Sequence, residues 1–339
     1  MFTLRQYLLA LLDSRGLTRT LGEIDVCRDE QGRPCFSAGN SAAVFRIRLG
    51  GRIRSLRCYL RPMRHLKEIY GQRLLKKELY LHTSPETGVW VDTVLGDWIE
   101  GSTLHETVAQ AAALRDRESL QILVRLFDRL ALALVTDDRA HGDLKPENII
   151  VGDDGTLCPI DFDASYLPAF AGEISPELGT AAYQHPARTA ADFDERIDDY
   201  PAALISTALH ALAEAPTLWD RYGSSDGLLY TPQRIASDPA YRATLALFEK
   251  RGMAVQYRIA QLLTAPTLRL FGLAELLAEA GRRPKRPNSS SKTGAGAIAR
   301  RSGSSSRRST TTGSTSPRGW PPFSSAARGT TSTRRAARA

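Results

Sequence analysis

The sequence has few cysteines and no long hydrophobic run. Its four cysteines, among 339 residues, form no CxxC pair and no Cys/His cluster with zinc spacing, which predicts reduced thiols rather than a disulfide framework. The most hydrophobic stretch, 200–213, falls short of the roughly 20 residues that span a bilayer, and we expect a buried helix there. The apolar run 7–12 lacks the features of a secretion signal. We therefore expect a cytoplasmic protein with no membrane partner.

Acidic residues are missing from the last 59 positions, which hold 14 Lys and Arg and 21 Ser and Thr. The first 280 residues carry 31 basic and 37 acidic residues, a net charge of −6, so the overall +8 comes from the tail. This balance argues against nucleic-acid binding by the folded part. The tail, 282–339, has too few aliphatic residues for a core and is predicted to be disordered. It is interpreted as an arm that contacts acidic partners or, with more weight, as a solvated tail or an out-of-frame extension.

Hydrophobic patterning divides the remaining chain into a strand-rich start and a helical remainder. Alternation on both sides of a Gly-Gly turn predicts a hairpin over 44–59, and a second hairpin is expected over 79–99. Residues 61–75 are helix-like, and apolar residues recur at helical spacing over 120–134. This order favours an α+β fold with a small sheet-rich lobe before a larger helical lobe.

The most informative stretch is His-Gly-Asp-Leu-Lys-Pro-Glu-Asn at 141–148, which an apolar run follows. After an Asp-Asp-Gly turn comes Ile-Asp-Phe-Asp at 160–163. A lone Asp-Leu-Lys-Pro is a common loop, but the two segments together have the spacing of a kinase catalytic loop and metal loop. The joint pattern therefore favours phosphoryl-transfer chemistry.

Phosphoryl transfer needs a carboxylate for the hydroxyl proton, oxygen ligands for Mg²⁺, and a cation where negative charge accumulates. Asp143 provides the first, Asn148 and Asp161 the second, and Lys145 the third. A hairpin over 149–160 would bring Asp161 back beside Asn148. The sequence thus predicts one site built from two loops.

On these residues the chain, from about Phe36 to Leu277, resembles the eukaryotic-type protein kinase superfamily, with the pattern of a bacterial Ser/Thr protein kinase-like branch. The resemblance implies a bilobal protein-kinase-like fold: a small N-lobe with an antiparallel sheet and one helix, and a larger, mainly helical C-lobe. It implies ATP and Mg²⁺ as cofactors. The expected boundaries are a helical extension 1–35, an N-lobe 36–101, a C-lobe 102–281 and the tail 282–339.

The resemblance also implies roles for residues of the C-lobe. Asp143 would be the catalytic base, Lys145 the γ-phosphate contact, and Asn148 and Asp161 the Mg²⁺ ligands. His141 would be structural.

Two further C-lobe positions match the family. Gly-Thr-Ala-Ala-Tyr at 179–183 resembles the end of an activation segment, in which Thr180 would face the acceptor hydroxyl. Asp198 would anchor the catalytic-loop backbone. Gly142 stands where an arginine would read an activation-loop phosphate, so activation by phosphorylation is not expected.

The N-lobe departs from the family pattern. Gly39 and Val44 lie in a phosphate-covering turn that keeps one glycine of three, and Arg57 takes the place of the ATP-binding lysine. An exposed strand cation is the alternative for Arg57. Its expected partner is Glu68 if the helix is 61–75, or Glu78 if that helix runs longer.

The hinge and the metal loop complete the resemblance. The Asp97 carbonyl and the Ile99 amide would hydrogen-bond adenine, although ordinary strand packing also fits this segment. Asp163 replaces a glycine and tolerates the positive φ that the loop needs.

The leading hypothesis is an ATP- and Mg²⁺-dependent kinase that acts on a Ser or Thr of a protein substrate. One alternative is a small-molecule kinase of the antibiotic-phosphotransferase type, and Lys145 and Thr180 argue against it. The other is a pseudokinase or scaffold, which Arg57 and the glycine-poor turn would favour.

Overall fold

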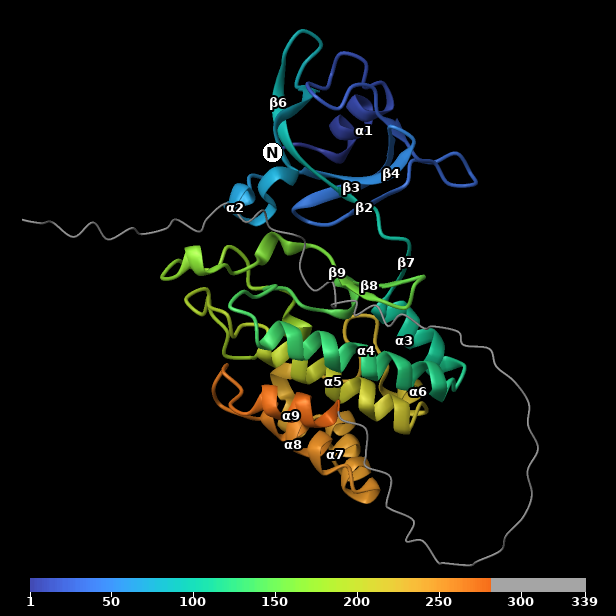
Figure 1. Ribbon diagram of the computed structural model, residues 1–339, viewed down its shortest axis with the longest axis vertical. Helices are drawn as coiled ribbons and strands as arrows, with labels where there is room; N and C mark the ends of the chain where they lie inside the picture. Colours follow the sequence, from blue (N-terminus) through green and yellow to red (C-terminus); the bar gives the residue numbers. More distant parts are fainter. Residues whose placement is uncertain (282–339) are drawn as a thin grey trace, which may run out of the picture.

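A small lobe built on a curled antiparallel sheet stands above a larger helical lobe (Figure 1). This computed structural model describes residues 1–281. The arrangement confirms the expected α+β, bilobal kinase-like fold. The predicted disorder of 282–339 lies outside the described residues.

The small-lobe sheet has the strand order β1-β3-β4-β6-β5, with β2 paired to β3. Both predicted hairpins are confirmed, because Phe45 pairs with Leu56 and Leu79 pairs with Val91 in antiparallel register. Buried and more exposed side chains alternate along these strands because successive side chains point to opposite faces of the sheet and one face is buried. The strands are β1 (Asp25–Val26), β2 (Phe36–Ala38), β3 (Ala42–Leu49), β4 (Arg52–Tyr59), β5 (Leu74–His82) and β6 (Gly88–Asp97).

Helix α1 (Leu4–Leu12) lies inside the curl of this sheet (Figure 1). Thr3 caps it in a capping box with Gln6, which satisfies backbone groups at the first turn. The buried Tyr7 ring belongs to the same apolar cluster as the sheet, and its hydroxyl donates to the Tyr59 carbonyl at 2.7 Å. Residues before β2 are therefore part of the small-lobe core, while the boundary at 35 stays a prediction.

The prediction of a helix over 61–75 is wrong for most of its length. Helix α2 covers only Leu66–Tyr70, the 3₁₀ turn η1 covers Gly71–Arg73, and β5 begins at Leu74. His65 and Gly71 have positive φ values of 58° and 54°, which interrupt a right-handed helix on both sides. Leu74 pairs with Val94 instead, so strand pairing overrides the local helical pattern.

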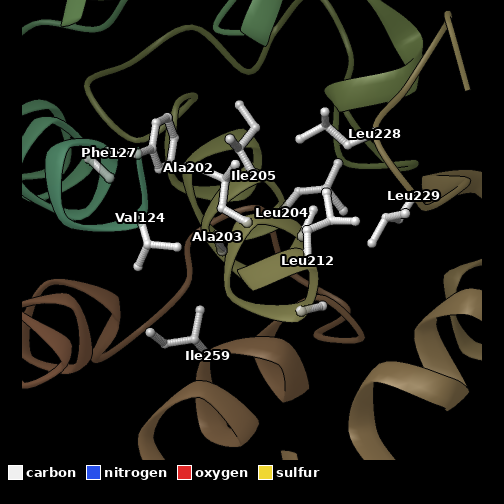
Figure 2. Packing of buried hydrophobic residues seen from close by; sticks show 14 of the residues in the cluster. Val124, Phe127, Ala202, Ala203, Leu204, Ile205, Leu212, Leu228, Leu229 and Ile259 are labelled. Atoms are coloured by element: carbon white, nitrogen blue, oxygen red, sulfur yellow. The ribbon is translucent and has the colours of Figure 1, made fainter. Parts of the chain in front are cut away.

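The large lobe is built around α5 (Asp199–Glu214), whose interior residues are buried on all sides. Figure 2 shows residues of this helix between Val124 and Phe127 of α4 on one side and Leu228, Leu229 and Ile259 on others. The predicted buried helix and the predicted amphipathic helix over 120–134 are both confirmed. The other helices are α3 (Leu104–Ala113), α4 (Arg117–Val135), α6 (Leu218–Tyr222), α7 (Pro239–Arg251), α8 (Ala254–Leu262) and α9 (Leu273–Ala280).

A second sheet, β7-β8-β9, tops the large lobe beneath the small lobe (Figure 1). The hairpin of β8 and β9 confirms the one expected over 149–160. These strands are β7 (Gly101–Thr103), β8 (Ile149–Gly152) and β9 (Leu157–Pro159). Short 3₁₀ turns flank them and the following loops: η2 (Pro146–Asn148), η3 (Phe162–Ala164), η4 (Pro168–Phe170), η5 (Ala181–Tyr183) and η6 (Pro232–Ser237).

An apolar cluster crosses the junction of the two lobes. Tyr59 and Tyr70 of the small lobe pack in it with Phe162, Phe170 and Phe193 of the large lobe. The lobes are thus joined by side-chain packing as well as by the chain. Among residues 1–281, no helix is both long and apolar enough to cross a membrane.

Candidate active site

The segment 141–148 forms the loop between α4 and β8, and a buried carboxylate holds its backbone. Asp198, only 1% exposed, accepts hydrogen bonds from the backbone N–H groups of His141 and Gly142, the latter at 3.0 Å. Asp198 makes no side-chain cap bond to α5, because these two N–H groups engage it. The ring of His141 meets the Ile160 carbonyl at 2.7 Å, so this histidine ties the two loops together.

Gly142 has a backbone that no other residue type could adopt here. Its φ is 80°, and a Cβ atom would lie 2.0 Å from the Ala164 carbonyl oxygen. An arginine side chain therefore cannot start from this position. A guanidinium reaches it from elsewhere, because Arg188, 9% exposed, donates from Nη1 to the Gly142 carbonyl at 3.0 Å.

Asp143 is surrounded by three donors. Its Oδ1 accepts from the Thr180 N–H at 2.6 Å, and its Oδ2 lies 3.2 Å from Asn148 Nδ2 and 3.3 Å from Lys145 Nζ. Lys145 Nζ also donates to Thr180 Oγ1 at 2.8 Å. The structure thus brings together the predicted base, the predicted phosphate contact and the threonine of the activation-segment motif.

These donors determine the charge of Asp143. Burial alone would raise the pKa of Asp143, but the Lys145 ammonium and the Thr180 N–H outweigh burial and lower this pKa below its ordinary value. The carboxylate is therefore ionised at neutral pH. In this form it can accept a hydrogen bond from an incoming hydroxyl.

Asn148 and Asp161 lie on adjoining ends of the β8–β9 hairpin. Asn148 uses Nδ2 for its bonds to Asp143, at 2.9 Å to the carbonyl and 3.2 Å to Oδ2, so its amide oxygen faces away from Asp143. The Ile160 N–H donates to the Asn148 carbonyl at 2.9 Å, which brings Asp161 next to Asn148. Asp161 has a left-handed backbone with φ 65°.

This pair of oxygen donors fits Mg²⁺ better than a metal that needs a full protein cage. Within residues 1–281, no group of three or more His, Cys, Asp and Glu side chains could hold a metal ion. Mg²⁺ typically takes one or two protein oxygens and completes its shell with water and substrate phosphates. Asn148 and Asp161 could hold it in that way.

Arg57 points from the small-lobe sheet into this site. It lies on β4 opposite Val44 and Val94, and its side chain is 13% exposed. Its guanidinium forms ion pairs with Asp161 and, at 2.7 Å, with Asp163. Arg57 is therefore not the exposed strand cation considered above.

The structure does not bring the expected glutamates to Arg57. Glu68 is exposed on α2, and Glu78 is buried on β5, where its carboxylate accepts from Thr20 and Leu21 N–H groups. Within residues 1–281, neither glutamate forms an ion pair with Arg57. Glu68 does not reach Arg57 because α2 is short. Glu78 does not reach Arg57 because its carboxylate binds the loop that contains Thr20.

The phosphate-covering turn is a tight hairpin. Gly39 N–H donates to the Ala42 carbonyl at 2.9 Å, which closes the connection between β2 and β3. Val44 follows on β3 beside Arg57. Figure 1 places β2 and β3 on the side of the small lobe that faces β8 and β9. Nucleotide contact by Gly39 and Val44 stays a prediction.

The predicted hinge residues Asp97 and Ile99 lie where β6 leaves the small lobe for β7. The Asp97 carbonyl accepts a hydrogen bond from Ser55 Oγ at 3.1 Å. A cavity of about 510 Å³ opens beside this connection, and it is lined by Trp98, Phe36 and other residues that precede and begin β2. Adenine binding by Asp97 and Ile99 stays a prediction.

Comparison with curated proteins finds protein kinases. CBL-interacting protein kinase 17 of Oryza sativa subsp. japonica is 30% identical over 167 residues, which are 48% of this chain and 35% of that protein. Serine/threonine-protein kinase PknL of Mycobacterium tuberculosis (strain ATCC 25618 / H37Rv) is 34% identical over 113 residues, which are 32% of this chain and 27% of that protein. The matches thus span about a third of the relatives' length or less, and no protein-family model matches the chain.

The bilobal architecture, the loop 141–148 that a buried aspartate anchors, and the partial similarity to protein kinases agree with one another. The chain thus has a bilobal fold of the protein-kinase-like type and partial similarity to protein kinases.

Proposed function

We propose that this chain is an ATP- and Mg²⁺-dependent protein kinase that phosphorylates Ser or Thr hydroxyls. The observation that carries the proposal is the position of Lys145 Nζ, 3.3 Å from Asp143 Oδ2 and 2.8 Å from Thr180 Oγ1. This cation joins the predicted base to the segment that would receive a protein substrate. A hydroxyl beside Asp143 would therefore meet a carboxylate and an ammonium together.

The chemistry that we propose follows from these groups. Asp143 accepts the proton of the acceptor hydroxyl, the hydroxyl oxygen forms a bond to the γ-phosphorus, and the bond from that phosphorus to the β–γ bridging oxygen breaks to release ADP. Lys145 offsets the negative charge that develops on the γ-phosphoryl oxygens. Mg²⁺ held by Asn148 and Asp161 would neutralise the β- and γ-phosphates.

The ion pair between Arg57 and Asp161 favours a second candidate, a pseudokinase that binds nucleotide without transferring phosphate. In this arrangement the carboxylate that should ligate Mg²⁺ already has a cationic partner. Nucleotide binding together with an absence of transfer to proteins and small molecules would support this alternative.

The test uses the full chain with radiolabelled ATP, Mg²⁺ and generic protein substrates. We expect phosphate incorporation into Ser and Thr, and we expect Asp143→Asn to reduce it by about 10² to 10⁴-fold, the range for loss of a general base. Asp25→Asn is the matched control, because it removes an exposed carboxylate from the small lobe that pairs with Arg48 at 3.6 Å. Equal incorporation by the Asp143 variant would remove the assigned base, and transfer only to small molecules would exclude a protein kinase.

A further inference from the structure

Asp163 is a buried carboxylate with four donor contacts at the junction of the lobes. It is 3% exposed. Its Oδ2 accepts from Arg57 Nε at 3.0 Å and faces Arg57 Nη2 at 2.7 Å, a two-pronged contact. Its Oδ1 accepts from the Tyr70 hydroxyl at 2.5 Å and from the Tyr59 hydroxyl at 3.2 Å. Every contact comes from the small lobe, although Asp163 belongs to the large lobe.

These contacts fix the orientation of the Arg57 guanidinium. Burial alone would lower the pKa of Arg57, but the oxygens of Tyr70, Asp161 and Asp163 raise it well above its ordinary value. The cation is permanently charged, so it requires a permanent partner in a site with little water. Asp163 is more deeply buried than Asp161, with 3% against 39% of the side chain exposed.

We propose that Asp163 is the positioning residue for Arg57, in the role that a helix glutamate plays for the nucleotide-binding lysine of protein kinases. The inference rests on the proposed function in one respect, namely that Arg57 contacts the nucleotide phosphates. It explains why α2 can be short and why Glu68 can face solvent. The carboxylate has moved from the helix to the metal loop, and α2 contributes the Tyr70 hydroxyl instead.

In this arrangement Asp161 and Asp163 have different roles. Arg57 contacts both, but only Asp161 is exposed enough to face a bound nucleotide. If Asp161 held Mg²⁺, Asp163 would still pair with Arg57 and would keep the guanidinium from becoming an unpaired buried charge. One cation can therefore serve the phosphates without losing its support.

A double-mutant cycle tests this role. The full chain, Asp163→Asn, Arg57→Gln and the double variant are titrated with a fluorescent ATP analogue in Mg²⁺, and Asp25→Asn serves as the exposed control. If Asp163 acts through Arg57, each single variant is expected to bind about tenfold more weakly, and the double variant no more weakly than either single. Independent losses that multiply to about a hundredfold in the double variant would overturn the inference.

Kinetics provide a readout that a purely structural role would not move. Asp163→Asn is expected to raise KM for ATP about tenfold while KM for the protein substrate is unchanged. If this variant does not fold, as judged by thermal unfolding, the cycle is run with Tyr70→Phe and Arg57→Lys. Tyr70→Phe removes one hydrogen bond from Asp163 and keeps the ion pair, and its smaller loss of affinity should vanish in the Arg57→Lys background. If Tyr70→Phe weakened nucleotide binding as much in the Arg57→Lys background as in the wild-type chain, the inference would be contradicted.

The outcomes separate the two proposals. A wild-type chain that binds no nucleotide overturns both. Nucleotide binding with independent effects of Asp163 and Arg57 overturns only the role of Asp163. Coupled effects on binding without phosphate transfer support the role of Asp163 and remove the proposed kinase reaction.

Discussion

Gly179 offers a sharp test of the site, because a side chain at this position would press on the predicted base. It has a φ of 71°, and a Cβ atom there would lie 2.8 Å from the Gly142 carbonyl and 3.0 Å from Asp143 Oδ1. Gly172 in the same segment has a similar φ of 85°, but a Cβ atom there would meet nothing within 4 Å. Alanine at either position imposes the left-handed cost of about 1–2 kcal/mol, and only Gly179→Ala pushes on Asp143.

The two variants should therefore differ in activity more than in stability. For a chain of this size, about 1–2 kcal/mol lowers the melting temperature by roughly 2–8 °C in either variant. A displacement of a catalytic group approaching 1 Å can cost about a hundredfold in rate, so we expect Gly179→Ala to lose at least about tenfold in kcat. Gly172→Ala should keep the wild-type kcat. Thermal unfolding and phosphate-transfer assays on both variants measure this, and equal kcat values would refute the close approach of Gly179 to Asp143.

Two further predictions concern charge. Burial raises the pKa of Asp199 to about 7. The folded chain therefore keeps a proton on this carboxyl that the unfolded chain releases above about pH 4. Because of this difference, the free energy of unfolding falls as the pH rises from 4 to 7. Asp199→Asn keeps an acceptor for the Leu270 N–H and should be more stable than wild type by about 2–4 kcal/mol at pH 7.5 but not at pH 4. Denaturant titrations at both pH values measure this difference. A gain in stability that does not depend on pH would contradict the raised pKa of Asp199. Arg61 pairs with Glu177, just before the predicted activation-segment motif, at 2.5 Å. This half-exposed contact is worth about 0–1 kcal/mol, so Arg61→Ala should leave the melting temperature nearly unchanged. Its kcat should fall severalfold if this pair holds the segment near Asp143, and an unchanged kcat would show that it does not.

The elements with strong periodicity could be predicted from the sequence. The hairpins over 44–59 and 79–99 and the buried helix α5 are where the alternation and the apolar run indicate. The helix expected over 61–75 does not form over that range, because Leu74 pairs with Val94 in the sheet, and no local pattern reveals this partner. Long-range pairing decides such segments, and local propensity cannot foresee it.

In the candidate site too, contacts within one loop could be predicted from the sequence, and contacts between distant segments could not. Asp143, Lys145 and Asn148 are close in sequence, so their convergence follows from one loop. The contact of Arg57 with Asp163 joins positions 106 residues apart, whereas the sequence predicts a glutamate partner for Arg57. A charged residue in the place of a glycine was the available signal, since an acidic side chain beside a metal loop needs a cation.

The apolar cluster between the lobes bears on how nucleotide could enter and leave. Tyr59 and Tyr70 pack against Phe162 and its neighbours, so swinging the lobes apart would wet this surface at a cost of roughly 25 cal/mol per Å² of apolar area. A wide-open resting state is therefore disfavoured. If the chain is the proposed kinase, exchange of ADP for ATP is expected to proceed through small local movements around the β2–β3 turn, and to slow down when larger side chains extend the cluster.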